Sequence, residues 1–208
     1  MSRLLTLTVA ACSLLGACRS EEADNGPPPS IARDEGADAA VRWFETIDLG
    51  LLAHDDADHG AAERLFDRAF ASGGGPVANR IAYLLINSRK DPAKGAIWYR
   101  RSAEAGDLQG MRYHARGLSE GIGQPRDETE SLRWKRRAAT HGKSNGYDFL
   151  TLAHAYDGGL GEKRNPEAAL AAVRIAKRKW IDDSDTDTPE RIEALEGRLM
   201  QELSRPAL

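Results

Sequence analysis

The chain has 208 residues, of which 41% are hydrophobic and 29% are charged, and its formal net charge is -3. This composition supports a folded core and excludes collagen-like and broadly disordered chains, and the balanced charge argues against a nucleic-acid binder with a dominant basic surface. Both cysteines, Cys12 and Cys18, lie near the N-terminus, so we expect no disulfide within the folded part.

The first residues predict a targeting segment. An apolar stretch over residues 4–17 follows Arg3 and is shorter than the roughly 20 residues that a membrane-spanning helix needs. We therefore expect residues 1–17 to be a cleaved signal. The sequence LGAC at residues 15–18 resembles the lipobox of bacterial lipoproteins, which implies that Cys18 is lipidated and becomes the mature N-terminus. The alternative is an ordinary secretory signal in which Cys18 is incidental.

Lipidation at Cys18 would anchor the protein to a membrane without spanning it. Arg19, and not an aspartate, follows the cysteine, and the lipoprotein resemblance then implies the periplasmic face of the outer membrane. Residues 18–37 are acidic and then proline-rich, a composition that favours a disordered tether.

The rest of the chain repeats. Residues 91–106 align with 127–142 at an offset of 36, and an offset of 38 carries the pattern on from Asp127 to Asn165. A backward offset of 33 aligns Asp91 with Asp58. Periods in the thirties with two helical stretches per unit are typical of helical solenoids. We therefore predict an all-α solenoid of αα-hairpin repeats over residues 58–180.

Capping residues predict where the helices begin and end. Asp91-Pro92 and Asn165-Pro166 each place an oxygen-bearing N-cap before a proline at the first helical position. Gly106 and Gly142 are expected to end the first helices in a left-handed conformation. The second helices are predicted over residues 108–120 and 147–157.

Two further helices should close the ends of the solenoid. Residues 38–57 form one amphipathic pattern, and residues 181–208 contain a loop and a second pattern that opens at Thr188-Pro189. A solenoid needs such capping helices because its terminal units have an apolar face without a neighbour.

The unit at residues 95–106 contains a small residue, Trp98-Tyr99 and Ala103-Glu104, and the second helix that follows it ends in Gly121-Ile122-Gly123. This pattern resembles the Sel-one-like repeat, a relative of the tetratricopeptide repeat, over residues 58 to about 180. The resemblance implies a non-enzymatic adaptor whose concave surface binds a protein partner, without a cofactor.

The same resemblance suggests a finer hypothesis and an alternative. Lipoproteins with these repeats include immunity proteins that neutralise phospholipase toxins delivered into the periplasm by type VI secretion, so the partner would be a secreted lipase toxin. The alternative is an enzyme that hydrolyses cell-wall or β-lactam substrates. The relatives proposed for that role carry paired cysteines in every repeat, which this chain lacks.

Three short motifs imitate chemical sites, and each has a simpler structural interpretation. Residues 117–121 fit the Gly-x-Ser-x-Gly elbow around Ser119, but they end a predicted helix and lack the required strand. Residues 54–59 offer two histidines and several carboxylates, which an acidic helix cap at Asp58 explains. The aspartates at 183–187 begin like a calcium loop but lack its later glycine and glutamate. We expect no catalytic residue and no metal.

The first helices of the units carry a series of basic residues. Arg100, Arg136 and Arg174 occupy one repeat position, and Lys135 is among the basic residues beside them. We predict a basic stripe that attracts an acidic surface of the partner. The alternative is a solvated helix face partly neutralised by nearby glutamates. The candidate partner-binding residues are Arg100, Arg101, Arg133, Arg136, Arg137 and Arg174.

Overall fold

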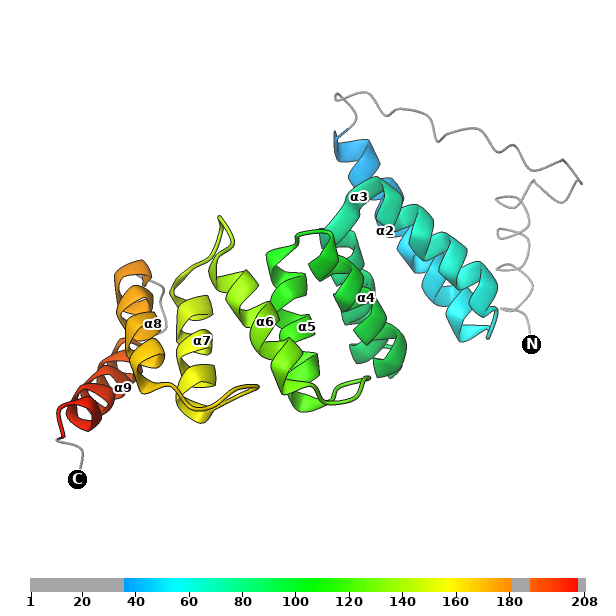
Figure 1. The fold of residues 1–208 in the computed structure, drawn as a ribbon. Helices are drawn as coiled ribbons and strands as arrows, with labels where there is room; N and C mark the ends of the chain where they lie inside the picture. The colour runs from blue at the N-terminus through cyan, green and yellow to red at the C-terminus, as the bar shows by residue number, and fades with distance from the viewer. Residues whose placement is uncertain (1–35, 181–187, 206–208) are drawn as a thin grey trace, which may run out of the picture. The chain divides into compact units, whose positions relative to one another are not determined.

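The structure is a computed structural model that describes residues 36–180 and 188–205, and all regular elements in these ranges are α-helices (Figure 1). The predicted signal peptide and the tether up to residue 35, with Cys18, and the aspartates at 183–187 lie outside the described residues. The helices are α2 (Gly36–Asp55), α3 (His59–Asn87), α4 (Pro92–Glu104), α5 (Leu108–Glu120), α6 (Glu128–Ala139), α7 (Gly146–Gly158), α8 (Pro166–Lys179) and α9 (Thr188–Leu203).

Each helix packs against the next one along the chain, from α2 with α3 to α8 with α9 (Figure 1). In addition, α3 contacts α5, two helices further on. Because contacts between near neighbours in sequence dominate, the fold is the predicted all-α solenoid of αα-hairpin repeats.

Side-chain caps fix the helix starts at the predicted positions. The Asp91 carboxylate accepts a hydrogen bond from the backbone N–H of Lys94 at 3.0 Å, and the Asn165 side chain accepts one from Ala168 at 2.9 Å. Asp58 caps α3 in the same way, by accepting from the N–H of Ala61 at 2.9 Å. Each cap contributes about 1 kcal/mol of stability.

Helix α3 contains both helices of the first repeat unit, joined across a break. Gly74 has φ 61° and ψ -142°, which is not helical, and Pro76 follows within the first turn of the second segment. Glycine tolerates this positive φ, and proline at a helix start sacrifices no hydrogen bond. The break lets the second half of α3 turn back against the next unit, where the Ser102 hydroxyl donates to the Gly75 carbonyl at 2.8 Å.

The loops after α5 and α7 each contain two glycines with different tasks. Gly121 closes α5 with φ 73°. Gly123 also has a positive φ, and a Cβ atom there would lie 1.8 Å from the carbonyl oxygen of Pro92, the first residue of α4. The loop after α7 repeats this contact, because a Cβ on Gly161 would lie 2.3 Å from the carbonyl oxygen of Glu128 at the start of α6. The loop after α5 therefore packs tightly on the beginning of α4, and the loop after α7 packs tightly on the beginning of α6.

The expected left-handed cap at Gly142 is wrong, whereas Gly106 does adopt a positive φ of 87°. Helix α6 ends at Ala139, and Thr140 closes it with right-handed geometry. The backbone N–H and the hydroxyl of Thr140 both donate to the carbonyl of Arg136 at 3.0 Å. Helix α4 ends two residues before Gly106, whereas α6 ends three residues before Gly142, so Gly142 lies one residue beyond the position that Gly106 takes.

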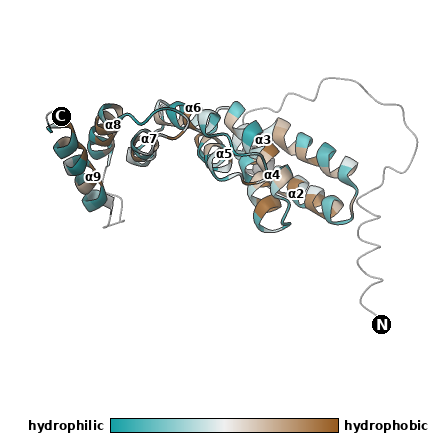
Figure 2. Ribbon diagram, turned by 60° about the horizontal axis from the view of Figure 1, so that its bottom comes forward, coloured by the Kyte–Doolittle hydropathy of each residue, from teal (hydrophilic) through white to brown (hydrophobic). Residues whose placement is uncertain are grey.

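The core lies between the helices and is built from aromatic and small side chains. Figure 2 shows hydrophobic and hydrophilic residues on different sides of the helices, as an amphipathic solenoid requires. Trp98 is buried and meets Phe66 edge-on, with ring centroids 5.8 Å apart. Trp134 is buried as well and meets His114 edge-on. Both tryptophans are therefore packing residues.

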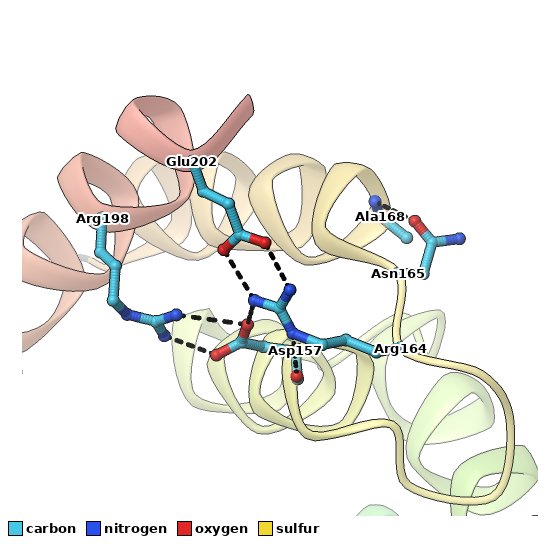
Figure 3. A network of polar contacts seen from close by, with 6 residues as sticks. All are labelled: Asp157, Arg164, Asn165, Ala168, Arg198 and Glu202. Atoms are coloured by element: carbon cyan, nitrogen blue, oxygen red, sulfur yellow. Dashed lines mark hydrogen bonds and ion pairs between the residues drawn. The ribbon is translucent and has the colours of Figure 1, made fainter. Parts of the chain in front are cut away.

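Helix α9 closes the C-terminal end through an apolar contact and an ion-pair network. Three of its side chains, Ile192, Leu195 and Leu199, are buried against α7 and α8. Figure 3 shows Arg164 between Asp157 of α7 and Glu202 of α9, with Arg198 on the other oxygen of Asp157. Within the described residues, no helix has the length and apolar character needed to cross a membrane.

Candidate functional site

The predicted basic stripe is largely neutralised by acids of the same chain. Arg100 pairs with Glu104 at 2.8 Å, and Arg136 pairs with Glu162 at 2.7 Å. The remaining predicted arginines also have partners: Arg174 pairs with Glu196, Arg101 with Asp67 and Arg133 with Glu130, and Arg137 lies 4.9 Å from the centroid of the Trp134 ring.

The pairs of Arg100 with Glu104 and of Arg133 with Glu130 confirm the neutralisation by nearby glutamates that the sequence suggested, and three further pairs were not expected. Asp67, Glu162 and Glu196 lie on α3, in the loop after α7 and on α9, so the sequence of one repeat does not reveal them. Paired charges project a weaker field than a row of free arginines, which reduces the attraction for an acidic surface. The partner-binding role of the stripe stays a prediction.

The motifs that imitate chemical sites have structural roles where they are described. The Ser119 hydroxyl donates to the carbonyl of Arg116 in its own helix at 3.0 Å. His54 lies 3.1 Å from a carboxylate oxygen of Asp91, and Asp58 is the helix cap. No group of three or more potential metal ligands comes together among the described residues.

Two adjoining hollows form the most distinctive surface of the described chain. The larger one has a volume of about 490 Å³ and lies between α5 and α7, with α6 below it. The smaller one, of about 330 Å³, lies between α3 and α5. Tyr113 and Arg116 line both hollows, so the two are neighbours along one face. We call this face of α3, α5 and α7 the groove.

Tyrosines and arginines line the groove. Tyr83, Tyr113 and Tyr147, one from each of the three helices, are exposed large side chains. Arg80 lies over the Tyr83 ring at 5.8 Å, and Arg112 lies over the Tyr147 ring at 5.5 Å. Tyrosine and arginine are the residue types that contribute most binding energy at protein interfaces, because they combine a large contact area with polar groups.

A buried ion pair joins α5 to the start of α7 inside the larger hollow. The guanidinium of Arg112 donates to both carboxylate oxygens of Asp148, at 2.7 and 2.8 Å, and the Asp148 side chain is fully buried. The same carboxylate accepts from the backbone N–H of Asn145 at the helix cap. These hydrogen bonds from Arg112 to Asp148 raise the pKa of Arg112. The pair fixes the wall of the hollow.

Lys135 lines the same hollow from α6 and is half-buried. Its ammonium group donates to the Ser131 hydroxyl at 3.0 Å, and no carboxylate of the described chain forms an ion pair with it. Burial lowers the pKa of Lys135, because desolvation disfavours the charged form. At the repeat offsets of 36 and 38, this position aligns with Tyr99 and Val173, which are both buried. A lysine therefore stands where the other units place an apolar side chain.

The smaller hollow contains two polar atoms without a partner. His114 is 4% exposed, and its Nδ1 has no hydrogen-bond partner within the described residues. The Nε2 of Gln124 is also buried without a partner. Burial lowers the pKa of His114, so its imidazole is neutral near pH 7. Buried polar atoms are normally hydrogen-bonded, and unpaired ones beside a hollow mark a place where a ligand can bind.

The helices that form the groove belong to segments that match a known repeat family. The Sel1 repeat model matches residues 77–107, 109–143 and 152–171. These three segments of the chain are Sel1 repeats. Each matched Sel1 repeat starts at a groove helix, since the three matches begin in the second half of α3, at α5 and in α7. The resemblance seen in the sequence is confirmed.

A solved structure shows the same fold as this chain. A Sel1 repeat protein from Oxalobacter formigenes has a TM-score of 0.56 and 19% identity, and the alignment covers 81% of this chain and 76% of that one. A protective antigen of uropathogenic Escherichia coli that displays an SLR fold has a TM-score of 0.49 and 17% identity over 85% of this chain and 43% of the antigen. No curated protein matches the chain.

Proposed function

We propose that this chain is a non-enzymatic scaffold that binds an extended segment of a partner protein along the groove. A Sel1-repeat scaffold suits protein–protein interaction. The observation that carries the proposal is the pair of adjoining hollows, which share Tyr113 and Arg116 and together extend over three successive repeats. A segment laid across them would contact tyrosines from α3, α5 and α7.

The charge of the groove favours an acidic partner. Three cationic side chains and two carboxylates line the larger hollow, whereas the whole chain has a net charge of -3. Arg80 adds a further positive charge on α3 beside the smaller hollow, 5.8 Å from the ring centroid of Tyr83, which lines it. Complementary charge guides a partner to the correct surface and increases the association rate.

The test separates the groove from the basic stripe with two variants. The groove variant combines Tyr113→Ala with Arg116→Ala, and the stripe variant combines Arg100→Glu, Arg136→Glu and Arg174→Glu. Each is used to capture proteins from a lysate of the cells that make the chain, and the Kd of a purified partner is then measured by calorimetry. Thermal unfolding verifies that both variants are folded.

We expect wild type and the stripe variant to bind the same partner, and the groove variant to lose about tenfold or more in affinity, as hot-spot truncation does. Unchanged binding by the groove variant would refute the proposal. Loss of binding by the stripe variant alone would assign the interface to the arginines of α4, α6 and α8.

We further propose that Cys18 anchors the scaffold to the periplasmic face of the outer membrane. The support is the lipobox-like sequence at residues 15–18 and the absence of an aspartate at position 19. Palmitate labelling of growing cells should mark the wild-type chain and leave Cys18→Ser unlabelled, and membrane fractionation should place the labelled chain in the outer membrane. Labelling of Cys18→Ser, or recovery in the inner membrane, would contradict this assignment.

The partner proposed at the finest level is a secreted antibacterial phospholipase, which would make the chain an immunity protein. Support comes from the lipoprotein and repeat resemblance alone. Deleting the gene should sensitise cells to neighbours that deliver the toxin, and the full chain should inhibit the purified lipase. Unchanged survival together with full lipase activity would exclude this partner and leave the scaffold proposal intact. The hydrolase alternative rests on the resemblance alone. Ser119 lines the larger hollow, but its hydroxyl donates to the carbonyl of Arg116, and no histidine is among the residues that line the hollow with it.

A further inference from the structure

Lys135 is the cation of the larger hollow that lacks a carboxylate among the described residues. We propose that Lys135 binds the carboxylate of an aspartate or glutamate side chain of the partner segment, and so sets the position of an acidic residue along the groove. This inference rests on the proposed function, because it names the chemical group of the partner that the larger hollow of the groove recognises.

The local geometry holds the ammonium group in place and leaves donors free. The Ser131 hydroxyl donates to the Ala115 carbonyl at 2.7 Å, so a lone pair of its oxygen accepts from Lys135 Nζ at 3.0 Å. Ser131 itself is fully buried. An ammonium group has three N–H donors, and this bond uses one of them. Two donors remain for an incoming carboxylate.

The other charges of the hollow are already matched. Arg112 and the helix cap occupy the carboxylate of Asp148. Arg116 donates to both oxygens of Glu120, at 3.0 and 3.1 Å. With these two pairs formed, the charge that remains in the hollow is that of Lys135. A carboxylate is the complementary group, whereas a basic side chain would be repelled.

The repeat itself shows that packing does not require a lysine here. The other units place Phe66, Tyr99 and Val173 at this position and bury all three side chains. A half-buried ammonium group without a counter-ion is unfavourable, and burial lowers the pKa of Lys135. A bound carboxylate would remove that penalty and form a charge-assisted hydrogen bond, so the unfavourable feature of the free protein becomes favourable in the complex.

The side chains around Lys135 suit an acidic residue within a peptide better than a free anion. Tyr113 and Tyr147 are exposed on opposite sides of the hollow, on α5 and α7, and can pack against neighbouring residues of the segment. The volume of about 490 Å³ lies within the range of about 300–1,000 Å³ that ligand sites occupy, and it accommodates more than one side chain.

A displayed library of random peptides tests this inference without a known partner. The full chain, Lys135→Met and Lys135→Glu each select peptides, and Lys163→Met, which removes an exposed lysine in the loop between α7 and α8, is the matched control. We expect wild type and Lys163→Met to select peptides that share an acidic residue. Lys135→Met should lose this preference, and Lys135→Glu should select lysine or arginine in its place.

A double-mutant cycle then measures the contact. Replacing the shared acidic residue by its amide should weaken binding to wild type about tenfold and change binding to Lys135→Met less than about twofold, because only direct neighbours are strongly coupled. Equal weakening for both proteins would overturn the inference, as would selected peptides without a shared acidic residue. Tighter binding of inorganic phosphate than of the peptide would show an anion site instead.

The Tyr113→Ala and Arg116→Ala groove variant separates this inference from the proposed function. If the selected peptides depend on the groove residues but not on Lys135, the carboxylate site is wrong and the groove stands. If they bind equally well to the groove variant, or if wild type retains no peptide, both fail. Unfolding midpoints of the Lys135 variants verify that they are folded.

Discussion

Two faces of this solenoid carry positive side chains, and they differ in whether those side chains have acidic partners. On α4, α6 and α8, the arginines of the repeat position meet acids of the same chain, as Arg100 does with Glu104. In the groove, Lys135 has no counter-ion among the described residues, and His114 keeps a buried nitrogen without a partner. The stripe is satisfied within the folded chain, whereas the groove is not. This difference in pairing, and not the number of charges, is what supports the proposal that a partner binds in the groove.

The largest effect should come from the one buried ion pair of the groove. Arg112→Leu leaves the Asp148 carboxylate buried without its cation and should reduce the free energy of unfolding by about 3 kcal/mol. Arg116→Leu, one turn further along α5, breaks an exposed pair and should cost less than about 1 kcal/mol. Denaturant unfolding measures both. Equal losses would mean that the Arg112 pair does not hold the wall of the hollow.

Lys135→Met should have the opposite sign and raise the free energy of unfolding by about 1 kcal/mol at pH 7, because it removes a poorly solvated charge. Since burial lowers the pKa of Lys135, the unfolded chain binds the proton more readily. Wild-type stability should therefore rise with pH between the lowered value and the ordinary value of 10.5, and the advantage of the variant should shrink there. Lys163→Met should stay within about 0.5 kcal/mol of wild type. A destabilised Lys135→Met would show that this lysine is a structural residue.

Single substitutions on the stripe should have small effects. Arg100→Gln and Arg133→Gln each break an exposed pair within one helix, at i,i+4 and i,i+3, and should change the free energy of unfolding by less than about 0.5 kcal/mol. High salt should reduce even this difference. Denaturant curves at low and high salt measure it. A decrease of about 2 kcal/mol in the free energy of unfolding at either site would mean that the stripe pairs contribute to stability almost as much as the buried pair of the groove.

The ion-pair network that joins α9 to α7 should contribute the same amount to the free energy of unfolding throughout the neutral pH range and should weaken only in acid. Hydrogen bonds from Arg198 lower the pKa of Asp157, and those from Arg164 lower the pKa of Glu202. Their contribution is complete above the ordinary values of 3.8 and 4.5 and is lost as pH falls through the lowered ones. Relative to the intrinsic exchange rate at each pH, hydrogen exchange in α9 should accelerate below about pH 4 and stay unchanged in α6. Asp157→Asn should weaken this pH dependence, and an unaltered profile would contradict the assignment.

Local chemistry explains how much of the fold could be predicted. The caps at Asp91 and Asn165 depend on a side chain and the proline beside it, so the starts of α4 and α8 were evident in the sequence. The expectation for Gly142 was wrong because α6 ends one repeat position earlier than α4, at Ala139, which the aligned glycines do not reveal. The repeat period predicted the solenoid because each unit carries the same small and aromatic residues.

The groove could not be predicted in the same way. Lys135 precedes Arg136 and was grouped with it, but successive residues of a helix point about 100° apart, and packing decides which one faces the hollow. A signal was present, because Lys135 aligns with the apolar residues Tyr99 and Val173. Three of the acids that neutralise the stripe, Asp67, Glu162 and Glu196, lie one or more elements away, where no repeat pattern extends.

The contact between Gly123 and the start of α4, and its counterpart between Gly161 and α6, fixes the spacing between successive units. Each loop contacts the first turn of its own unit before the next unit begins, so the spacing is set within every unit. A tandem copy of residues 128–165 would contain both this contact and a groove helix. The solenoid can therefore lengthen by internal duplication, with one more groove helix per copy, while α2 and α9 continue to close its ends.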